Sequence, residues 1–204
     1  MSFVPQGTVY GVLLNFKAEA EALAPQMGLP PYKAPPKAPV LYVKTANTWS
    51  PHGSTVTLPR DAAQVEVGAT IAMVIGARGS VAGHVLMNDF SLPHASFFRP
   101  PVKYKCVDGF LGIGPAPRVG GDPSGFSLEV RINGETRHTA DFSQLVRSAP
   151  QLLADVNEFM TLAPGDVLML GCNAGRPMAR AGDHIEIVAP GFETLRNTLV
   201  QEAA

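Results

Sequence analysis

Short alternations of apolar and polar residues dominate the chain and predict many short strands. The clearest is FSLEVRI at residues 126–132, which Asn133 and Gly134 connect to a returning strand at residues 135–139. A second hairpin is predicted where residues 65–76 return through residues 81–89 after a four-residue turn. Further apolar segments that favour strands lie at residues 8–15, 40–44, 55–58, 167–171 and 184–189.

Helical patterns are fewer and shorter. Residues 17–27 form one such pattern, which Gly28 and two prolines end. A stronger pattern begins after Ser148, a suitable N-cap, and places Leu153, Val156, Phe159 and Met160 on one face. Three prolines exclude helix and central strand from residues 32–39. We therefore expect a mostly β (α+β) protein with one principal helix, and a single domain over residues 1–204.

Composition narrows the classes of partner. Hydrophobic residues make up 46% of the chain, charged residues only 16%, and the formal net charge is -1, so binding to nucleic acid or an acidic membrane surface is not expected. The longest apolar segments fall short of the roughly 20 residues that cross a bilayer, and we expect a cytoplasmic protein. Cys106 and Cys172 are far apart and lack metal-ligand spacing, which favours two reduced thiols.

Residues 88–109, NDFSLPHASFFRPPVKYKCVDG, carry the densest mixture of charged, apolar and proline residues. The prolines exclude a long helix, so we expect a strand that leads into an ordered loop. Lys105 and Asp108 form either a cationic clamp for a substrate oxygen or a salt bridge at the rim of a sheet. Lys44 and Arg99, together with Lys103, either bind an anionic substrate or remain solvated charges.

Generic motifs add little. GFLGIG at residues 109–114 lacks the strand-to-helix context of a phosphate loop, and the five histidines stand singly along the chain.

Longer strings carry a family resemblance. YKAPPKAPV, GATIAMVIG, NDFSLPHASFFRP, VKYKCVDGF, NEFMTLAPGDVLMLG and AGDHIEIVAPGF follow one another in order over nearly the whole chain. In these strings the chain resembles the fumarylacetoacetate hydrolase family, and especially the N-terminal type of half found in its two-domain isomerase/decarboxylases. The resemblance implies a mixed β-sandwich or roll with the active site at one open end.

The same resemblance implies chemistry on 2-hydroxy or 2-oxo dienoic acids. The expected activity is isomerisation of 2-hydroxyhepta-2,4-diene-1,7-dioate coupled to decarboxylation of 5-oxopent-3-ene-1,2,5-tricarboxylate. Members of the family commonly use Mg²⁺ or Mn²⁺ to stabilise an enolate. The implied partners are a dicarboxylate or tricarboxylate substrate and a second subunit, in a homodimer or in a heterodimer with a paralogous C-terminal-type subunit.

Departures from the family pattern fall on the metal site. The Glu-x-Glu ligands fall on Gly68 and Thr70, which leaves Asp89 alone, so no metal is expected unless substrate oxygens help Asp89 to hold one. The family's active-site histidine falls on Glu19, and its glutamate three residues later falls on Ala22, so a histidine-glutamate relay is not expected.

The resemblance also assigns roles to individual residues. We expect Lys105 to clamp an enolate or carboxylate and Asp89 to transfer protons, with Arg99 and Lys44 binding substrate carboxylates. Further substrate contacts are expected from three positions: Asp108, Cys172 and Asn173. The alternative is a metal-free, catalytically silent partner of a metal-binding paralogous subunit.

Overall fold

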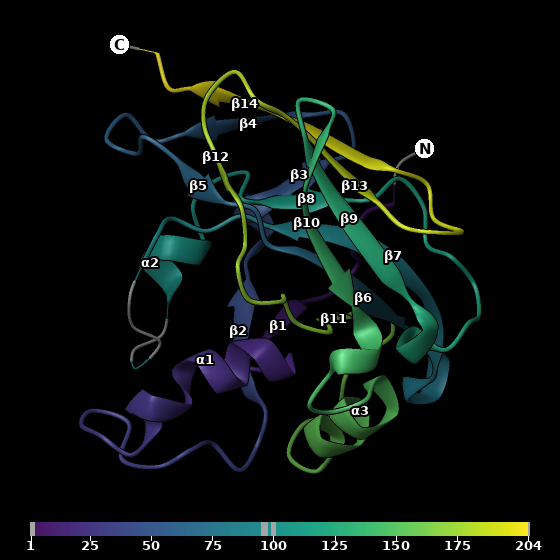
Figure 1. Cartoon of the computed structure of the whole chain (residues 1–204). Helices are drawn as coiled ribbons and strands as arrows, with labels where there is room; N and C mark the ends of the chain where they lie inside the picture. Colours follow the sequence, from purple (N-terminus) through teal and green to yellow (C-terminus); the bar gives the residue numbers. More distant parts are fainter. Residues whose placement is uncertain (1–2, 95–97, 99–100, 204) are drawn as a thin grey trace.

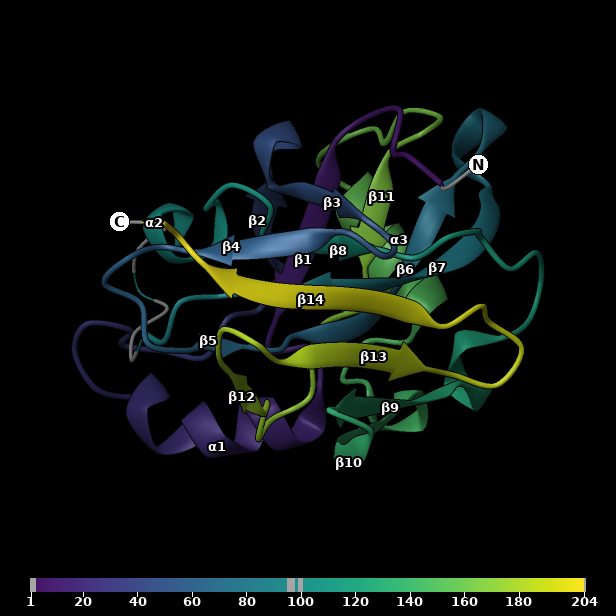
Figure 2. The same cartoon turned by 90° about the horizontal axis from the view of Figure 1, so that it is seen from above.

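The computed structural model describes residues 3–94, 98 and 101–203. Within these residues the strands form a seven-stranded sheet, a five-stranded sheet and a two-stranded ribbon. Figure 2 shows the five-stranded sheet lying across the larger one. In Figure 1, helices α1 and α3 lie below the sheets and α2 lies at the side. The mostly β sandwich that the sequence predicts is confirmed.

The larger sheet has the order β2-β1-β11-β6-β7-β8-β3. Its strands are β1 (Val9–Leu13), β2 (Val40–Lys44), β3 (Trp49–Pro51), β6 (Ala69–Ile75), β7 (Val81–Asp89), β8 (Leu111–Ile113) and β11 (Val167–Met169). Strand β2 pairs antiparallel with β1 and forms one edge of the sheet, while β7 lies well inside it. Three strands separate β2 from β7 in this order, yet Lys44 at the end of β2 lies 3.0 Å from Asp89 at the end of β7.

The smaller sheet has the order β10-β9-β13-β14-β4. Its strands are β4 (Thr55–Leu58), β9 (Ser127–Ile132), β10 (Glu135–Asp141), β13 (His184–Val188) and β14 (Leu195–Gln201), and the ribbon pairs β5 (Val65–Glu66) with β12 (Met178–Ala179). The helices are α1 (Lys17–Met27), α2 (Val102–Lys105) and α3 (Ala149–Asn157). Short 3-10 turns occupy Ala46–Thr48, Ala77–Gly79, Pro123–Gly125 and Phe142–Gln144.

The apolar interior has two parts because central strands of the larger sheet are buried on both faces. On β6, Ile71 and Met73 pack into the core shared with the smaller sheet, while Ala72 and Val74 belong to a second cluster on the opposite face. This explains why β6 reads as a continuous apolar run and not as an alternation. The second cluster also contains Tyr42, which connects it to the functional groups described below.

Most predicted elements are confirmed, including the helix at Lys17–Met27 and the strand at Val40–Lys44. The 133–134 turn has positive φ at both residues, as expected for a tight hairpin. Ser148 caps α3 by accepting a hydrogen bond from the Gln151 backbone.

Two expectations are wrong in detail, and a strand was missed. The strand predicted over residues 65–76 is interrupted before Ala69, and β5 pairs with β12 outside the larger sheet. Helix α3 ends at Asn157, and Phe159 is 60% exposed instead of lying on its buried face. Strand β14 was not predicted, because Arg196, Asn197 and Thr198 interrupt its apolar pattern although it lies between β13 and β4.

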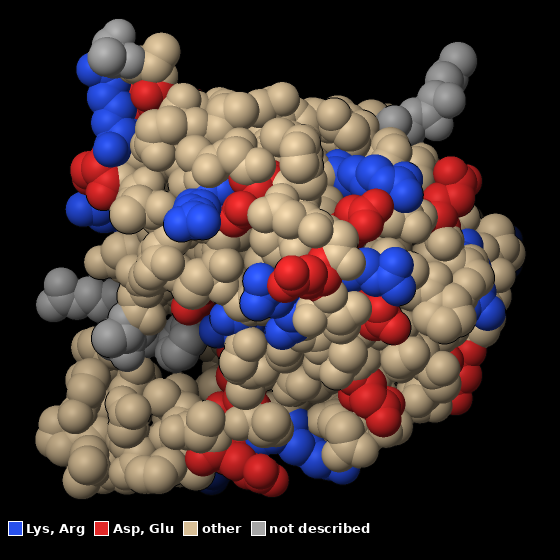
Figure 3. All heavy atoms as spheres, turned by 45° about the horizontal axis from the view of Figure 1, so that its top comes forward, with Lys and Arg blue, Asp and Glu red and all other residues tan. Residues whose placement is uncertain are grey.

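The surface carries charges of both signs. Figure 3 shows basic and acidic side chains interspersed over the face it presents, without a large region of one sign. This agrees with the formal net charge of -1. Among the described residues, no helix is long and apolar enough to span a membrane.

Candidate functional site

The ends of β2 and β7 and the short helix α2 bring three predicted residues into one charged cluster. The Lys44 Nζ lies 3.0 Å from Asp89 Oδ1, and the Lys105 Nζ lies 2.5 Å from Asp89 Oδ2. All three side chains are almost fully buried, with residue exposures of 1% for Lys44, 1% for Asp89 and 3% for Lys105. We call Lys44, Asp89 and Lys105 the lysine cluster.

Strand periodicity adds two hydroxyl groups to this cluster. Tyr42 precedes Lys44 by two residues on β2, so both side chains lie on the same face, and the Tyr42 hydroxyl donates to Asp89 Oδ2 over 2.5 Å. Ser91 follows Asp89 by two residues, and its Oγ accepts from the Lys105 Nζ over 2.8 Å. The Lys105 Nζ also lies 4.7 Å from the centroid of the Tyr42 ring.

Gly11 makes room for Tyr42. The two residues are paired across β1 and β2, and a Cβ atom at position 11 would lie 2.0 Å from the Tyr42 ring. The ring therefore lies directly over the glycine, and any larger residue there would displace it. The glycine of the VYGVL strand is a packing requirement of the site.

Lys44 connects several elements. Besides its ion pair with Asp89, its Nζ donates to the Phe110 carbonyl oxygen over 2.7 Å and to the carbonyl oxygen of Lys105, with a longer contact to that of Phe90. These acceptors surround the ammonium group with protein atoms. Its geometry suits a residue that holds Asp89 and the following segments together, and its side chain is fully covered.

The electrostatics of the cluster favour an ionised Asp89. Burial opposes its ionisation, yet Lys105 and Lys44, aided by hydrogen bonds from Lys105 and Tyr42, hold the pKa of Asp89 well below its usual value. Burial and the neighbouring Asp89 raise the pKa of Tyr42 well above its usual value, so the hydroxyl stays a donor. Burial lowers the pKa of Lys44, which Asp89 partly offsets.

A second cluster has the opposite composition. Arg176, in the segment between β11 and β12, has Nη1 3.0 Å from Glu19 Oε1 and Nε 3.3 Å from Glu66 Oε2. Glu19 Oε2 also accepts from the Leu14 backbone over 2.7 Å. Burial raises the pKa of Glu19 although Arg176 opposes the shift, and Lys105 is close enough to act on it too. We call Glu19, Arg176 and Glu66 the arginine cluster.

Cys172 and Asn173 lie in the segment that leads to Arg176. The Cys172 Sγ donates to the Gly68 carbonyl oxygen over 3.3 Å, and burial, with Asp89 nearby, raises the pKa of the thiol to about 12. Asn173 is half-buried and its Oδ1 accepts from the Ala174 backbone. Asp89 also acts on the pKa of Arg176, so the two clusters share one electrostatic environment.

A cavity of about 450 Å³ adjoins the lysine cluster along the edge strand β2. Lys105 belongs both to its lining and to the lysine cluster, and Tyr42, which donates to Asp89, also lines it. Cys106 contributes a thiol whose Sγ donates to the Val43 carbonyl oxygen. The rest of the lining is apolar apart from Thr45, and comprises Leu13, Val40, Leu41, Val43, Phe98, Pro101 and Val102. The volume lies within the range of roughly 300–1,000 Å³ typical of small-molecule sites.

One predicted residue, Asp108, is not part of this arrangement. Asp108 is exposed and its Oδ1 accepts from Asn47 Nδ2 over 2.6 Å, whereas Lys105 pairs with Asp89. The pair that the sequence suggested, Lys105 with Asp108, is therefore not formed, and Lys105 pairs with Asp89 instead. Arg99 lies outside the described residues.

The residues present do not fit the divalent cation that the family resemblance implies. Both Asp89 oxygens already contact lysines, and a Cβ atom at Gly68 would lie 2.3 Å from the Asp89 carbonyl oxygen. Thr70 donates its hydroxyl to the Gly171 carbonyl oxygen over 2.5 Å. The described part of the chain holds no group of three or more histidine, cysteine, aspartate or glutamate residues that could bind a metal.

Sequence reasoning missed four functional groups. Tyr42 and Ser91 could have been found, because each lies two residues from a predicted site residue on an extended segment. Arg176 and Glu66 could not, because the sequence does not reveal that the segment after β11 lies against β5 and α1.

Comparisons with known proteins place this geometry in a family. The family model described as fumarylacetoacetate (FAA) hydrolase C-terminal matches residues 8–200. The chain belongs to the fumarylacetoacetate hydrolase family. The 4-hydroxyphenylacetate degradation bifunctional isomerase/decarboxylase of Salmonella dublin is 37% identical over 97% of the chain, and that of Escherichia coli is 35% identical over the same share. The chain covers 48% of each relative, about half of its length.

Solved structures support the same fold. A 5-carboxymethyl-2-hydroxymuconate delta-isomerase from Mycobacterium smegmatis superposes with a TM-score of 0.80 at 28% identity, covering 97% of this chain and 80% of that one. A 2-hydroxyhepta-2,4-diene-1,7-dioate isomerase from Mycobacterium marinum gives 0.78 at 22% identity, covering 97% and 75%, and supports the fold alone.

Proposed function

We propose that the chain is an N-terminal-type subunit of an isomerase/decarboxylase of 4-hydroxyphenylacetate degradation. Its substrates would be 2-hydroxyhepta-2,4-diene-1,7-dioate and 5-oxopent-3-ene-1,2,5-tricarboxylate. The observation that carries the proposal is Lys105, which belongs to the lining of an otherwise largely apolar cavity and whose ammonium group is anchored by Asp89 and Ser91. Such a cavity suits an unsaturated carbon chain that ends in a carboxylate.

The reactions explain why a fixed cation is useful. Isomerisation of the dienol moves one proton from the enol oxygen to a carbon of the conjugated system, so no oxidant or reductant is needed. Decarboxylation breaks a carbon-carbon bond, releases carbon dioxide and leaves the electron pair on the conjugated system until a proton arrives. In both reactions negative charge gathers on oxygen, where Lys105 would stabilise it.

Within this proposal the other residues of the lysine cluster act through Lys105. Asp89 is held ionised, so it accepts hydrogen bonds and orients Lys105 and Tyr42. Lys44 holds Asp89 in place through its ion pair and carbonyl contacts. Arg99, Asp108, Cys172 and Asn173 remain proposed substrate contacts.

A direct test follows the ultraviolet band of the dienoate with the isolated chain. We expect turnover in the wild type and a loss of about 10²-fold or more in Lys105→Gln, because the developing oxygen anion loses its cation. Lys103→Gln is the matched control: Lys103 belongs to the same helix, but it is exposed and is not part of the cavity lining, so we treat it as a solvated charge. An unchanged rate in Lys105→Gln would remove Lys105 from the mechanism.

The alternative function is a catalytically silent partner of a metal-binding paralogue. It is favoured by the missing metal ligands and by relatives about twice as long, which leaves room for a second domain as partner. Activity that appears only after the paralogous subunit is added, and that survives Lys105→Gln, would support this alternative. We propose a homodimer or a heterodimer with such a subunit, which sedimentation of the chain alone and of the mixture would distinguish.

Cysteine labelling tests the cavity without turnover. Cys106 lines the cavity, whereas Cys172 is buried with a thiol pKa of about 12, so a thiol reagent at pH 8 should modify Cys106 first. A bound dienoate should slow the reaction of Cys106, which peptide mass analysis would measure. Equal labelling rates with and without dienoate would place the substrate elsewhere.

A further inference from the structure

Both oxygens of Asp89 lie beside ammonium groups of the protein itself. Oδ1 lies 3.0 Å from the Lys44 Nζ, and Oδ2 lies 2.5 Å from the Lys105 Nζ and accepts the Tyr42 hydroxyl. A hard divalent cation requires several oxygen ligands and would stand beside two ammonium groups here. Charge repulsion from these two ammonium groups opposes its binding.

The main chain closes the position from which a second ligand would come. The Gly68 carbonyl oxygen accepts from the Asp89 backbone over 2.8 Å, so the two backbones are in direct contact. The atom that a Cβ at position 68 would approach, at 2.3 Å, is the backbone oxygen of Asp89 and not the end of a flexible side chain. A glutamate at this position would therefore require the main chain to move.

The nearby carboxylates of the arginine cluster do not supply a substitute site. Glu19 and Glu66 are both paired with Arg176, whose guanidinium bridges them. Arg176 keeps its charge at every pH of interest, and the neighbouring acidic groups raise its pKa further despite burial. The bridging position that a metal would need is filled by this group.

The lysine cluster contains one more positive than negative charge in an almost fully buried position. Buried charges are normally paired, so an excess ammonium group beside a cavity favours an anionic ligand. Lys105 is the member that adjoins the cavity, and Ser91 and Asp89 fix the direction of its Nζ. The ligand class is a carboxylate or an enolate oxygen.

We propose that the Lys105 ammonium, backed by Lys44 through Asp89, takes the place of the divalent cation in this chain and binds the substrate oxygen anion without a metal. The substrate class rests on the proposed function. The anion site itself does not, because it follows from the charges and the cavity alone.

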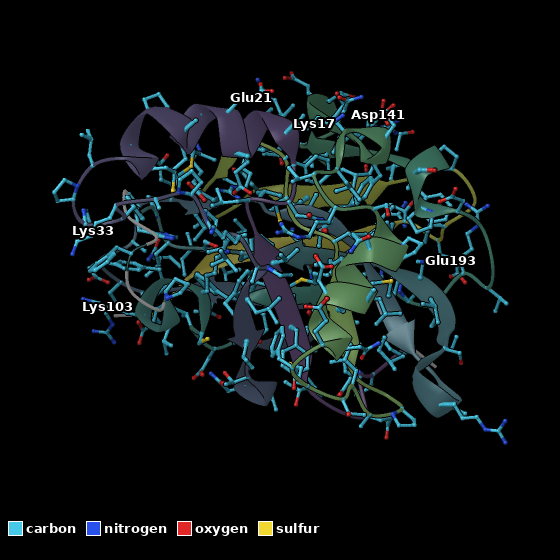
Figure 4. All side chains as sticks on the ribbon, turned by 90° about the horizontal axis from the view of Figure 1, so that it is seen from below. Lys17, Glu21, Lys33, Lys103, Asp141 and Glu193 are labelled. Atoms are coloured by element: carbon cyan, nitrogen blue, oxygen red, sulfur yellow. The ribbon has the colours of Figure 1, made fainter. Side chains whose placement is uncertain are left out.

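The first test measures anion binding without turnover. The probe is oxalate, a small planar dicarboxylate, in a buffer that contains a chelator, with sodium chloride of equal ionic strength as reference. We expect oxalate to raise the wild-type melting temperature by about 3 °C or more. Lys105→Gln should lose the shift and Lys103→Gln should keep it; Figure 4 shows Lys103 at the outer edge of the molecule. A shift that survives in Lys105→Gln, or that needs added Mg²⁺, would overturn the inference.

Lys105→Gln should fold, because Asp89 keeps Lys44 and the Tyr42 hydroxyl as partners. If it does not, Ser91→Ala provides the second variant, since it removes only the hydroxyl that accepts from Lys105. The oxalate shift should then be reduced by half or more in Ser91→Ala. An undiminished shift would show that the fixed direction of Lys105 is irrelevant to the anion.

The second test measures metal binding directly. Mn²⁺ is titrated into the chelator-treated chain while the paramagnetic resonance signal of free Mn²⁺ is recorded. We expect no saturable loss of signal at equimolar concentrations, and stoichiometric binding would overturn the inference.

Turnover then separates the two proposals. Chelator-resistant turnover supports both, and turnover that requires Mg²⁺ supports the proposed function while overturning the metal-free site. A third outcome is possible: oxalate binds without metal, Lys105→Gln abolishes that binding, and no turnover is seen under any condition. This outcome would support the anion site and overturn the proposed function.

Discussion

The lysine cluster and the arginine cluster have the same design with opposite signs. In the first, two ammonium groups flank one carboxylate, and in the second, two carboxylates flank one guanidinium. The first therefore has an excess positive charge and the second an excess negative charge. The pair is neutral as a whole yet strongly polarised, which directs an anion toward Lys105 and away from Glu19.

The clusters also differ in burial, which decides what each can tolerate. The side chains of Lys44 and Asp89 are 0% exposed, whereas that of Arg176 is 15% and that of Glu66 is 23% exposed. A fully buried charged group that loses its partner cannot be solvated by water, whereas a partly exposed one can. Damage to the lysine cluster should therefore cost more stability than damage to the arginine cluster.

The largest effect is expected from Asp89→Asn. It leaves two buried ammonium groups without a counter-charge and should lower the free energy of unfolding by about 3–5 kcal/mol. Urea denaturation at pH 7 measures the change, and Asp61→Asn, at an exposed position, should change it by less than about 0.5 kcal/mol.

The loss of stability in Asp89→Asn should depend on pH in a defined direction. Because the pKa of Asp89 is held low in the folded protein, its contribution is present above the usual value of 3.8 and is lost as the pH falls below that value. The deficit of Asp89→Asn should therefore stay constant from pH 7 to about 5 and shrink only in stronger acid. A deficit that disappears by pH 5 would contradict an ionised, lysine-paired Asp89.

A smaller loss, about 2 kcal/mol at pH 7.5, is expected from Arg176→Gln, because Glu19 loses its partner while remaining buried. Burial already raises the pKa of Glu19, and without Arg176 it should rise further. A carboxyl group whose pKa is raised by folding stabilises the folded state when the pH is below its usual pKa of 4.5. It loses that contribution as the pH rises through its pKa in the folded state. The deficit should thus be small at pH 4.5 and full at pH 7.5.

The control for this variant is Arg137→Gln. Arg137 pairs with Glu135 on the surface, with both side chains more than half exposed, so its loss should have little effect at either pH. An Arg176→Gln deficit that does not depend on pH would show that Glu19 does not titrate in response to its partner.

The smallest expected change comes from Tyr42→Phe, which removes one hydrogen bond to Asp89 and keeps both ion pairs. We expect a loss of about 1.5 kcal/mol, measured by urea denaturation. Tyr104→Phe is the control, because Tyr104 is 36% exposed and its ring stacks on His94 without using the hydroxyl. A loss as large as that of Asp89→Asn would mean that Tyr42, and not the lysines, holds the carboxylate.

The sequence predicted the elements of this site better than their contacts. Local patterns located the strands that carry Lys44 and Asp89, because alternation and turn residues act within a few positions. They also placed the α1 helix that carries Glu19 at its observed bounds. Strand β14 was missed because its neighbours β4 and β13, and not its own pattern, bury it.

Ion pairs between residues far apart in the chain could not be predicted from the sequence, for a physical reason. Asp108 is three residues from Lys105, yet the lysine points inward to Asp89, sixteen residues away, because α2 turns its last residue toward the sheet. Arg176 meets Glu19 across 157 positions of chain. Neither choice of partner is encoded in spacing.

The contact between Gly68 and the backbone of Asp89 limits what substitutions can achieve. A side chain at position 68 does not fit while the Asp89 backbone oxygen keeps its present place, 2.3 Å from where its Cβ would lie. Glutamate introduced at position 68 alone would therefore displace the Asp89 backbone and disturb the lysine cluster before it could hold a cation.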